Sequence, residues 1–133
     1  MEYEDLTEKI IGCAFRVRRK IGFGFLESVY RKCMVIELEQ EGMQAEPERA
    51  ITVRYEDQVV GEFFADILVD RLVIVELKSV RALVAAHEIQ LVNYLTATGM
   101  PVGLLLNFGE SKVDVIRKVR TLAKTNPRDE SPE

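Results

Sequence analysis

Cysteine and histidine are scarce in this chain of 133 residues, which has two cysteines and one histidine. Cys13 and Cys33 each lie among apolar residues with helical spacing, so a reduced, buried role is favoured over a disulfide. One histidine without paired cysteines also disfavours a conventional zinc site. Any metal bound by this sequence is therefore expected to use oxygen ligands.

Long hydrophobic runs and a signal-like N-terminus are absent as well. No apolar stretch approaches the roughly 20 residues that a membrane-spanning helix needs. A composition of 47% hydrophobic and 30% charged residues is typical of a globular protein. We therefore expect a cytoplasmic protein with no membrane partner, one domain over residues 1–123, and a flexible C-terminal tail over residues 124–133.

An excess of basic charge is also missing, since the net charge is −4. This disfavours nonspecific binding of nucleic acid over the whole surface. Residues 12–34 and residues 111–128 nevertheless each carry six basic residues and one acidic residue, a net charge of +5. They predict either a basic face that steers a polyanion or ordinary solvated helix faces, and the sequence leaves both open.

Helical spacing marks the N-terminal third of the chain. Asp5, with Glu8 three positions later, is typical of an N-cap and its reciprocal carboxylate, and apolar residues then recur at helical spacing over about residues 6–20. A second apolar stripe covers residues 26–42 after a glycine break at Gly22. The sequence therefore predicts two helices in succession.

Alternation and β-branched residues mark the following segments as strands. The predicted strands are ITVRY (51–55), VVGEFFADILV (59–69), LVIVEL (72–77), PVGLLLNF (101–108) and a final short strand within 112–119. A helix is predicted over about residues 82–98, with the apolar positions Leu83, Ala86, Ile89, Val92 and Leu95. This order of elements predicts an α/β fold, a mixed central sheet flanked by helices.

Three charged residues interrupt the apolar stretch FFADILVDRLVIVELKSV: Asp66, Glu76 and Lys78. Burying an ionised side chain costs several kcal/mol unless a partner or a metal compensates it. Alternation places Glu76 and Lys78 on one face of a strand, roughly 7 Å apart. A two-residue turn would point Asp66 to the other face, whereas a three-residue turn at 70–72, or a bulge, sets Asp66 opposite Glu76. A joint site therefore requires the odd register.

Two converging carboxylates repel each other unless a cation lies between them, and oxygen ligands of this kind suit Mg²⁺ or Mn²⁺. A nearby lysine can orient a water molecule and stabilise a developing phosphorane, so Asp66, Glu76 and Lys78 fit phosphodiester hydrolysis. The alternative is an Asp66–Lys78 or Glu76–Lys78 ion pair at the edge of the sheet. The residues alone leave both interpretations open.

Two of the predicted helices carry further polar residues. Glu27 and Tyr30 lie one turn apart and can face the same side, although a glutamate in the first turn is also explained by the helix dipole. His87, Gln90 and Tyr94 share a helix face, which is either solvated or brought beside the strand that carries the charged residues. His87 would at most support the site from outside it.

Together these motifs resemble the GxxExxY proteins, a small-domain branch of the PD-(D/E)xK nuclease superfamily. The naming signature is matched by Gly24, Glu27 and Tyr30. The later family motifs are matched, in the same order, by Asp66, Glu76-Leu77-Lys78, Gln90-x-x-x-Tyr94 and GLLLNFG at 103–109. The similarity covers about residues 5–120. The proline of the superfamily name is absent because Ala65 precedes Asp66, and that position varies across the superfamily.

The resemblance implies an αβββαβ nuclease core with an extra N-terminal helix. It implies that Asp66, Glu76 and the Leu77 carbonyl bind a divalent metal ion, with Glu27 as a direct or water-mediated ligand. Lys78 would position the attacking water. Gln90 and Tyr94 would help to orient the site and the nucleic acid strand.

We therefore expect a nuclease that depends on Mg²⁺ or Mn²⁺ and hydrolyses phosphodiester bonds, with DNA as the expected nucleic acid. The alternative is a catalytically inactive module of the same fold that binds nucleic acid or a protein partner, since the superfamily includes such members. A homodimer is compatible with either function, because many small nucleases pair to address two strands, but no residue indicates it.

Overall fold

Five strands form one mixed sheet in the computed structural model, which describes residues 3–120. In sheet order the strands are β1 (Ala45–Tyr55), β2 (Gln58–Val69), β3 (Val73–Lys78), β4 (Val102–Phe108) and β5 (Val113–Val119). β3 and β4 are parallel, and the other neighbours are antiparallel. The predicted mixed α/β sheet is confirmed, including its final short strand.

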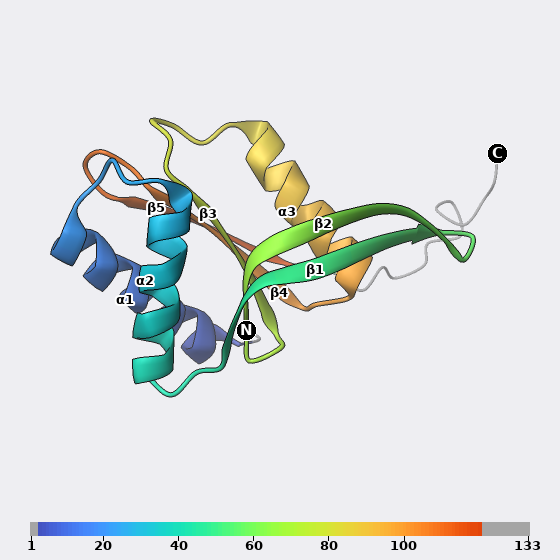
Figure 1. The fold of residues 1–133 in the computed structure, drawn as a ribbon, viewed down its shortest axis with the longest axis horizontal. Helices are drawn as coiled ribbons and strands as arrows, with labels where there is room; N and C mark the ends of the chain where they lie inside the picture. Colours follow the sequence, from blue (N-terminus) through green and yellow to red (C-terminus); the bar gives the residue numbers. More distant parts are fainter. Residues whose placement is uncertain (1–2, 121–133) are drawn as a thin grey trace.

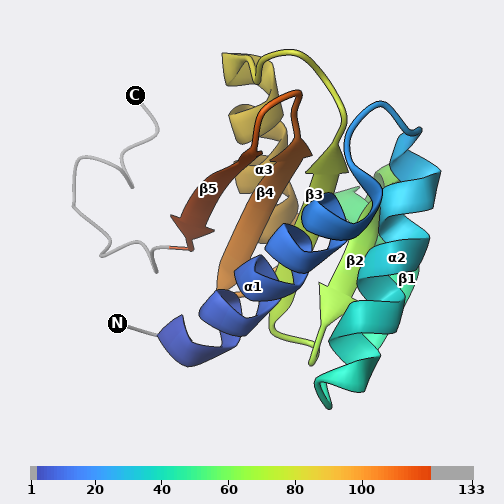
Figure 2. The same cartoon turned by 90° about the vertical axis from the view of Figure 1, so that its left-hand side faces the viewer.

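Three helices cover the two faces of this sheet: α1 (Glu4–Ile21), α2 (Glu27–Gln40) and α3 (Ala85–Thr98). Helices α1 and α2 lie together on one face, and α3 lies on the other (Figures 1 and 2). α3 connects the parallel strands β3 and β4, as a crossover between parallel strands requires. Within residues 3–120, no helix has the length and apolar character needed to cross a membrane.

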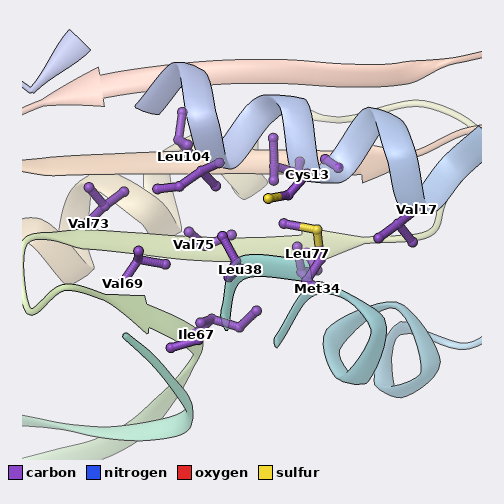
Figure 3. Packing of buried hydrophobic residues seen from close by; sticks show 14 of the residues in the cluster. Cys13, Val17, Met34, Leu38, Ile67, Val69, Val73, Val75, Leu77 and Leu104 are labelled. Atoms are coloured by element: carbon purple, nitrogen blue, oxygen red, sulfur yellow. The ribbon is translucent and has the colours of Figure 1, made fainter. Parts of the chain in front are cut away.

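The central strands β3 and β4 are buried on both faces, as their nearly continuous apolar sequences predict. On one face, residues such as Val75, Leu77 and Leu104 pack against α1 and α2 (Figure 3). On the other face, α3 approaches β4 so closely that a Cβ atom added to Gly103 would lie 2.6 Å from Cδ1 of Leu91. The absence of a side chain at Gly103 therefore sets the distance between α3 and the sheet.

The turn between β2 and β3 has the odd register that a joint site requires. Val69 pairs with Val73, and Ile67 pairs with Val75, so the turn consists of residues 70–72. Asp70, which has a positive φ of 51°, accepts a hydrogen bond at Oδ1 from the backbone N–H of Gln44. The three-residue alternative is therefore the one that the structure adopts.

A long hairpin is the part of the fold that the sequence predicted least well. β1 begins at Ala45 and includes Pro47, which we expected in a loop. β2 pairs with β3 over residues 67–69 and with β1 along most of its length. The β1–β2 hairpin therefore extends beyond the other three strands as a two-stranded ribbon (Figure 1).

Two helix starts also differ from the sequence prediction. α1 begins at Glu4 rather than after an Asp5 cap, because its N-cap is Tyr3, with no side-chain cap bond. α3 begins at Ala85 instead of about residue 82. Its buried residues are Leu91, Tyr94 and Leu95, whereas the predicted core positions Ile89 and Val92 are exposed. The tail predicted at 124–133 and the domain end predicted at residue 123 lie outside the described residues.

Candidate active site

Asp66 and Glu76 lie at the point where β2 and β3 separate. The last backbone pair on this side is Ile67 with Val75. Beyond this pair, the backbone N–H groups bind carboxylates instead of backbone carbonyls. Asp66 N–H donates to Oε2 of Glu76 at 3.1 Å, and Leu77 N–H donates to Oδ2 of Asp66 at 2.7 Å. The two carboxylates therefore occupy the gap between the strands, and each is held by the backbone of the other strand.

An irregularity in β1 and β2 accompanies this arrangement. Glu48, opposite Asp66, has a positive φ of 52°. Ala65 packs on the α3 side of the sheet and Ile67 on the α1 and α2 side, although regular alternation would place both on one face. The strand therefore turns its side chains over at Asp66 without a shift of register, since Pro47 pairs with Ile67 and Arg49 with Ala65.

Burial dominates the electrostatics of the carboxylate pair. Glu76 is 6% exposed, and burial together with the nearby Asp66 carboxylate raises the pKa of Glu76 to about 8. The charge of Glu27 raises this pKa as well. Burial also raises the pKa of Asp66, against the opposing effects of the Leu77 N–H and the Arg31 guanidinium. A cation between these carboxylates would relieve the cost of ionising them.

Lys78 does not form either of the ion pairs that were the alternative to a metal site. Among residues 3–120, Lys78 forms no ion pair within 4.0 Å, so neither an Asp66–Lys78 nor a Glu76–Lys78 pair is present. Instead, Nη1 of Arg31 lies 3.5 Å from Oδ1 of Asp66. No motif in the sequence marks Arg31 as a site residue, although it follows Glu27 by one helical turn and so faces the same side of α2.

Lys78 is half-buried at the end of β3, where its charge lowers the pKa of both Asp66 and Glu76. It pairs in register with Asn107 on β4. The fully buried Asn107 amide donates to Val80 O and accepts from Val80 N–H, both at 2.9 Å. Asn107 therefore holds the segment that follows Lys78, a role that the sequence analysis missed.

Tyr30 holds the loop before α2 and does not take part in the carboxylate cluster. Its ring is fully buried and stacks on Phe108, with 4.2 Å between the ring centroids. Its hydroxyl donates to Gly22 O at 2.7 Å and accepts from Phe25 N–H at 3.4 Å. Ser79, just after Lys78, donates to Phe25 O at 2.9 Å. Tyr30 therefore fixes the loop between α1 and α2, and Phe25 of this loop binds the residue that follows β3.

Replacing Tyr30 with phenylalanine is expected to lower the free energy of unfolding by about 1–2 kcal/mol, because Gly22 O would lose its buried donor. Urea denaturation measures this difference. Tyr55→Phe is the matched control, since Tyr55 is 69% exposed. Equal effects of the two substitutions would contradict the role assigned to the Tyr30 hydroxyl.

The three polar residues of α3 have three different environments. Tyr94 is 7% exposed, and burial, followed by the charges of Glu76 and Asp66, raises the pKa of Tyr94. Gln90 is exposed and lines a hollow beside Tyr94. His87 accepts a hydrogen bond at Nδ1 from Val84 N–H, 3.2 Å away, and so caps the start of α3. Of these three residues, Tyr94 is therefore the one whose pKa the two carboxylates raise.

The oxygen atoms around Asp66 and Glu76 suit a hard divalent ion, but few of them belong to carboxylates. Within residues 3–120, no group of three or more His, Cys, Asp or Glu side chains is placed to hold a metal ion. A metal site would therefore need Asp66, Glu76, a backbone carbonyl such as that of Leu77, and water. Such mixed oxygen coordination is usual for Mg²⁺, which retains several water ligands.

The two basic segments are largely engaged within the protein. Arg16 and Lys20 lie 3.0 Å and 2.9 Å from the Glu37 carboxylate. In the second segment, Lys118 lies 3.0 Å from Glu88, and the part beyond residue 120 lies outside the described residues. These cations therefore contribute more to internal ion pairs than to a free basic face.

Comparison with known proteins identifies the family. The sequence matches the PD-(D/E)XK nuclease superfamily over residues 4–119, so the chain belongs to that superfamily. PD-(D/E)XK nucleases generally use divalent metal ions, and membership suggests a nuclease-like function and nucleic acid binding. A search of curated proteins finds no match.

A solved structure shares the fold. The crystal structure of SSO0001 has a TM-score of 0.60 and 17% sequence identity to this chain. The alignment covers 92% of this chain and 61% of that protein, so the chain spans about three fifths of the length of SSO0001. At this identity the similarity shows a common fold.

Proposed function

We propose that this protein is a divalent-metal-dependent nuclease that hydrolyses phosphodiester bonds in DNA, and that it belongs to the GxxExxY branch of its superfamily. The observation that carries the proposal is the convergence of Asp66 and Glu76 between β2 and β3. A buried and a half-buried carboxylate with raised pKa values at one point form a typical site for a hard cation. We further propose that residues 1–123 form a single nuclease domain.

Asp66, Glu76 and the Leu77 carbonyl would hold Mg²⁺ or Mn²⁺, with Glu27 as a direct or water-mediated ligand. When bound, the ion would neutralise phosphate charge and lower the pKa of a water molecule. The Leu77 N–H keeps the Asp66 carboxylate oriented, and the Arg31 guanidinium holds its other oxygen. These contacts would thus pre-organise the ligands.

Lys78 is the residue that we assign to the chemical step. Its ammonium group has no carboxylate partner within 4.0 Å among the described residues, so it can orient the attacking water and stabilise negative charge on the phosphate. Tyr94 lies close enough to the carboxylates for their charges to affect it. Gln90, beside it, would contact the nucleic acid strand.

An inactive module of the same fold is the second candidate, and the Arg31 contact favours it. A guanidinium 3.5 Å from Asp66 already supplies positive charge that a metal ion would otherwise supply. Such a module would bind nucleic acid or a protein without cutting it, and its melting temperature would not rise with Mn²⁺.

Cleavage assays on labelled DNA separate these candidates. The purified protein is incubated with single-stranded and duplex DNA in Mg²⁺, in Mn²⁺ and in EDTA, and Lys78→Met is assayed beside it. Metal-dependent cleavage that Lys78→Met lacks supports the nuclease. Cleavage that persists unchanged in Lys78→Met would come from a contaminant or from another site.

A further inference from the structure

A hollow of about 850 Å³ lies between the β1–β2 hairpin and α3. Val53, Arg54 and Phe63 line it from the hairpin, and Gln90, Asn93 and Tyr94 line it from α3. Tyr94 is also within electrostatic reach of Glu76 and Asp66. The hollow therefore begins beside the candidate active site and continues along the ribbon that extends beyond the sheet.

Phe63 presents an aromatic surface to this hollow. Its ring centroid lies 5.9 Å from that of Tyr94, with a tilt of 41° between the rings. The ring also lies over Gly61, where an added Cβ atom would be 3.2 Å from it. Phe63 is nevertheless 45% exposed, so much of its ring is available for a contact from outside the protein.

The residues that line the hollow carry a positive net charge, unlike the whole protein. Among the described residues that line the hollow, Arg54 is the one charged side chain, whereas the chain has a net charge of −4. A polyanion would therefore meet no carboxylate in the hollow itself. The amides of Gln90 and Asn93 add donors and acceptors that can bind base edges.

We propose that this hollow binds unpaired bases of single-stranded DNA, so that the enzyme acts on single strands and frayed ends in preference to intact duplex. In a duplex the faces of the bases are covered by their neighbours, whereas an unpaired base can stack on an exposed aromatic ring. An apolar and aromatic hollow with a single cation suits bases better than it suits the phosphates of a duplex. This inference names the substrate class and rests on the proposed nuclease function.

Phe63 and its neighbour Phe64 provide a matched pair of variants. The two residues are adjacent in β2, so their side chains point to opposite faces of the ribbon. They are 45% and 63% exposed, so replacing either with alanine removes a similar ring with little loss of core packing. Of these two residues, Phe63 lines the hollow and Phe64 does not.

Fluorescence anisotropy tests the inference with a labelled 12-nucleotide DNA strand and the matching duplex, in Ca²⁺ or EDTA so that binding is measured without cleavage. We expect the wild-type protein to bind the single strand at least about tenfold more tightly than the duplex. Phe63→Ala should weaken single-strand binding about tenfold, and Phe64→Ala should change it less than twofold.

Equal affinity for strand and duplex, no binding of either, or equal effects of the two substitutions would overturn the inference. A dimer in sedimentation that Phe63→Ala dissociates would assign the hollow to a second copy and would also overturn it. Single-strand binding that Phe63→Ala weakens, without any Mn²⁺-dependent cleavage, would reject the nuclease function and with it the preference in cleavage, while the assignment of the hollow to unpaired bases would stand. Equal cleavage rates on strand and duplex would keep the nuclease and reject the inference.

Discussion

Lys78→Met is expected to lower the rate of metal-dependent DNA cleavage by about 10²- to 10³-fold, the usual cost of removing one group that stabilises charge in the transition state. Lys78 is half-buried, close enough to Asp66 and Glu76 to lower their pKa values, and not in an ion pair within 4.0 Å among the described residues. Methionine keeps most of the apolar stem, so the fold should be retained.

Two further results distinguish a catalytic lysine from a structural one. Mn²⁺ binding should persist in Lys78→Met, because the substitution removes a cation from beside the carboxylates and leaves the ligands in place. Lys112→Met is the control, since Lys112 is 75% exposed and lies on the loop before β5. If Lys78→Met and Lys112→Met cleave DNA at the wild-type rate, Lys78 has no role in the chemical step.

Glu76→Gln is expected to stabilise the metal-free protein at alkaline pH. The folded-state pKa of Glu76 is about 8, against an ordinary value of 4.5. Between these pH values the folded protein keeps a proton that the unfolded chain has released, so the stability of the wild-type protein falls as pH rises through this window. The full difference is on the order of 5 kcal/mol above pH 8. Glutamine avoids this loss and can still accept the hydrogen bond from Asp66 N–H.

Urea denaturation in EDTA from pH 5 to pH 9 measures this effect. The two proteins should have similar stability near pH 5, and the advantage of Glu76→Gln should grow up to about pH 8.5. Glu62→Gln, at an exposed position of β2, should follow the wild-type curve at every pH. A Glu76→Gln protein less stable than wild type at pH 8.5 would mean that the ionised carboxylate stabilises the fold.

Local sequence patterns predicted most of the architecture. Apolar periodicity gave the helices and strands in their correct order, and the nearly continuous apolar sequence of β4 predicted a strand with all seven residues buried. The spacing of Asp66 and Glu76 also reduced their relationship to two registers, of which the structure adopts the odd one. Alternation in a strand is strict enough to carry such a prediction.

The features that the sequence did not predict depend on contacts between distant segments. Arg31 reaches Asp66 from α2 across 35 positions of sequence, and no local pattern indicates that pair. The side chains of β2 turn over at Asp66, opposite Glu48, whose positive φ is a backbone conformation that glutamate rarely adopts. Ile89 and Val92 were expected in the core because they are apolar, but both are exposed, and Ile89 lines the hollow between α3 and the hairpin.

A crystal soaked in Mn²⁺ tests most directly whether Asp66 and Glu76 form a metal site. Anomalous scattering should place an ion within about 2.5 Å of carboxylate oxygens from both residues and close to the Leu77 carbonyl. The Arg31 guanidinium should then lie more than 3.5 Å from Asp66, its distance in the present structure. Crystals with no anomalous peak between the two carboxylates at saturating Mn²⁺ would contradict the metal site, and with it the proposed nuclease mechanism.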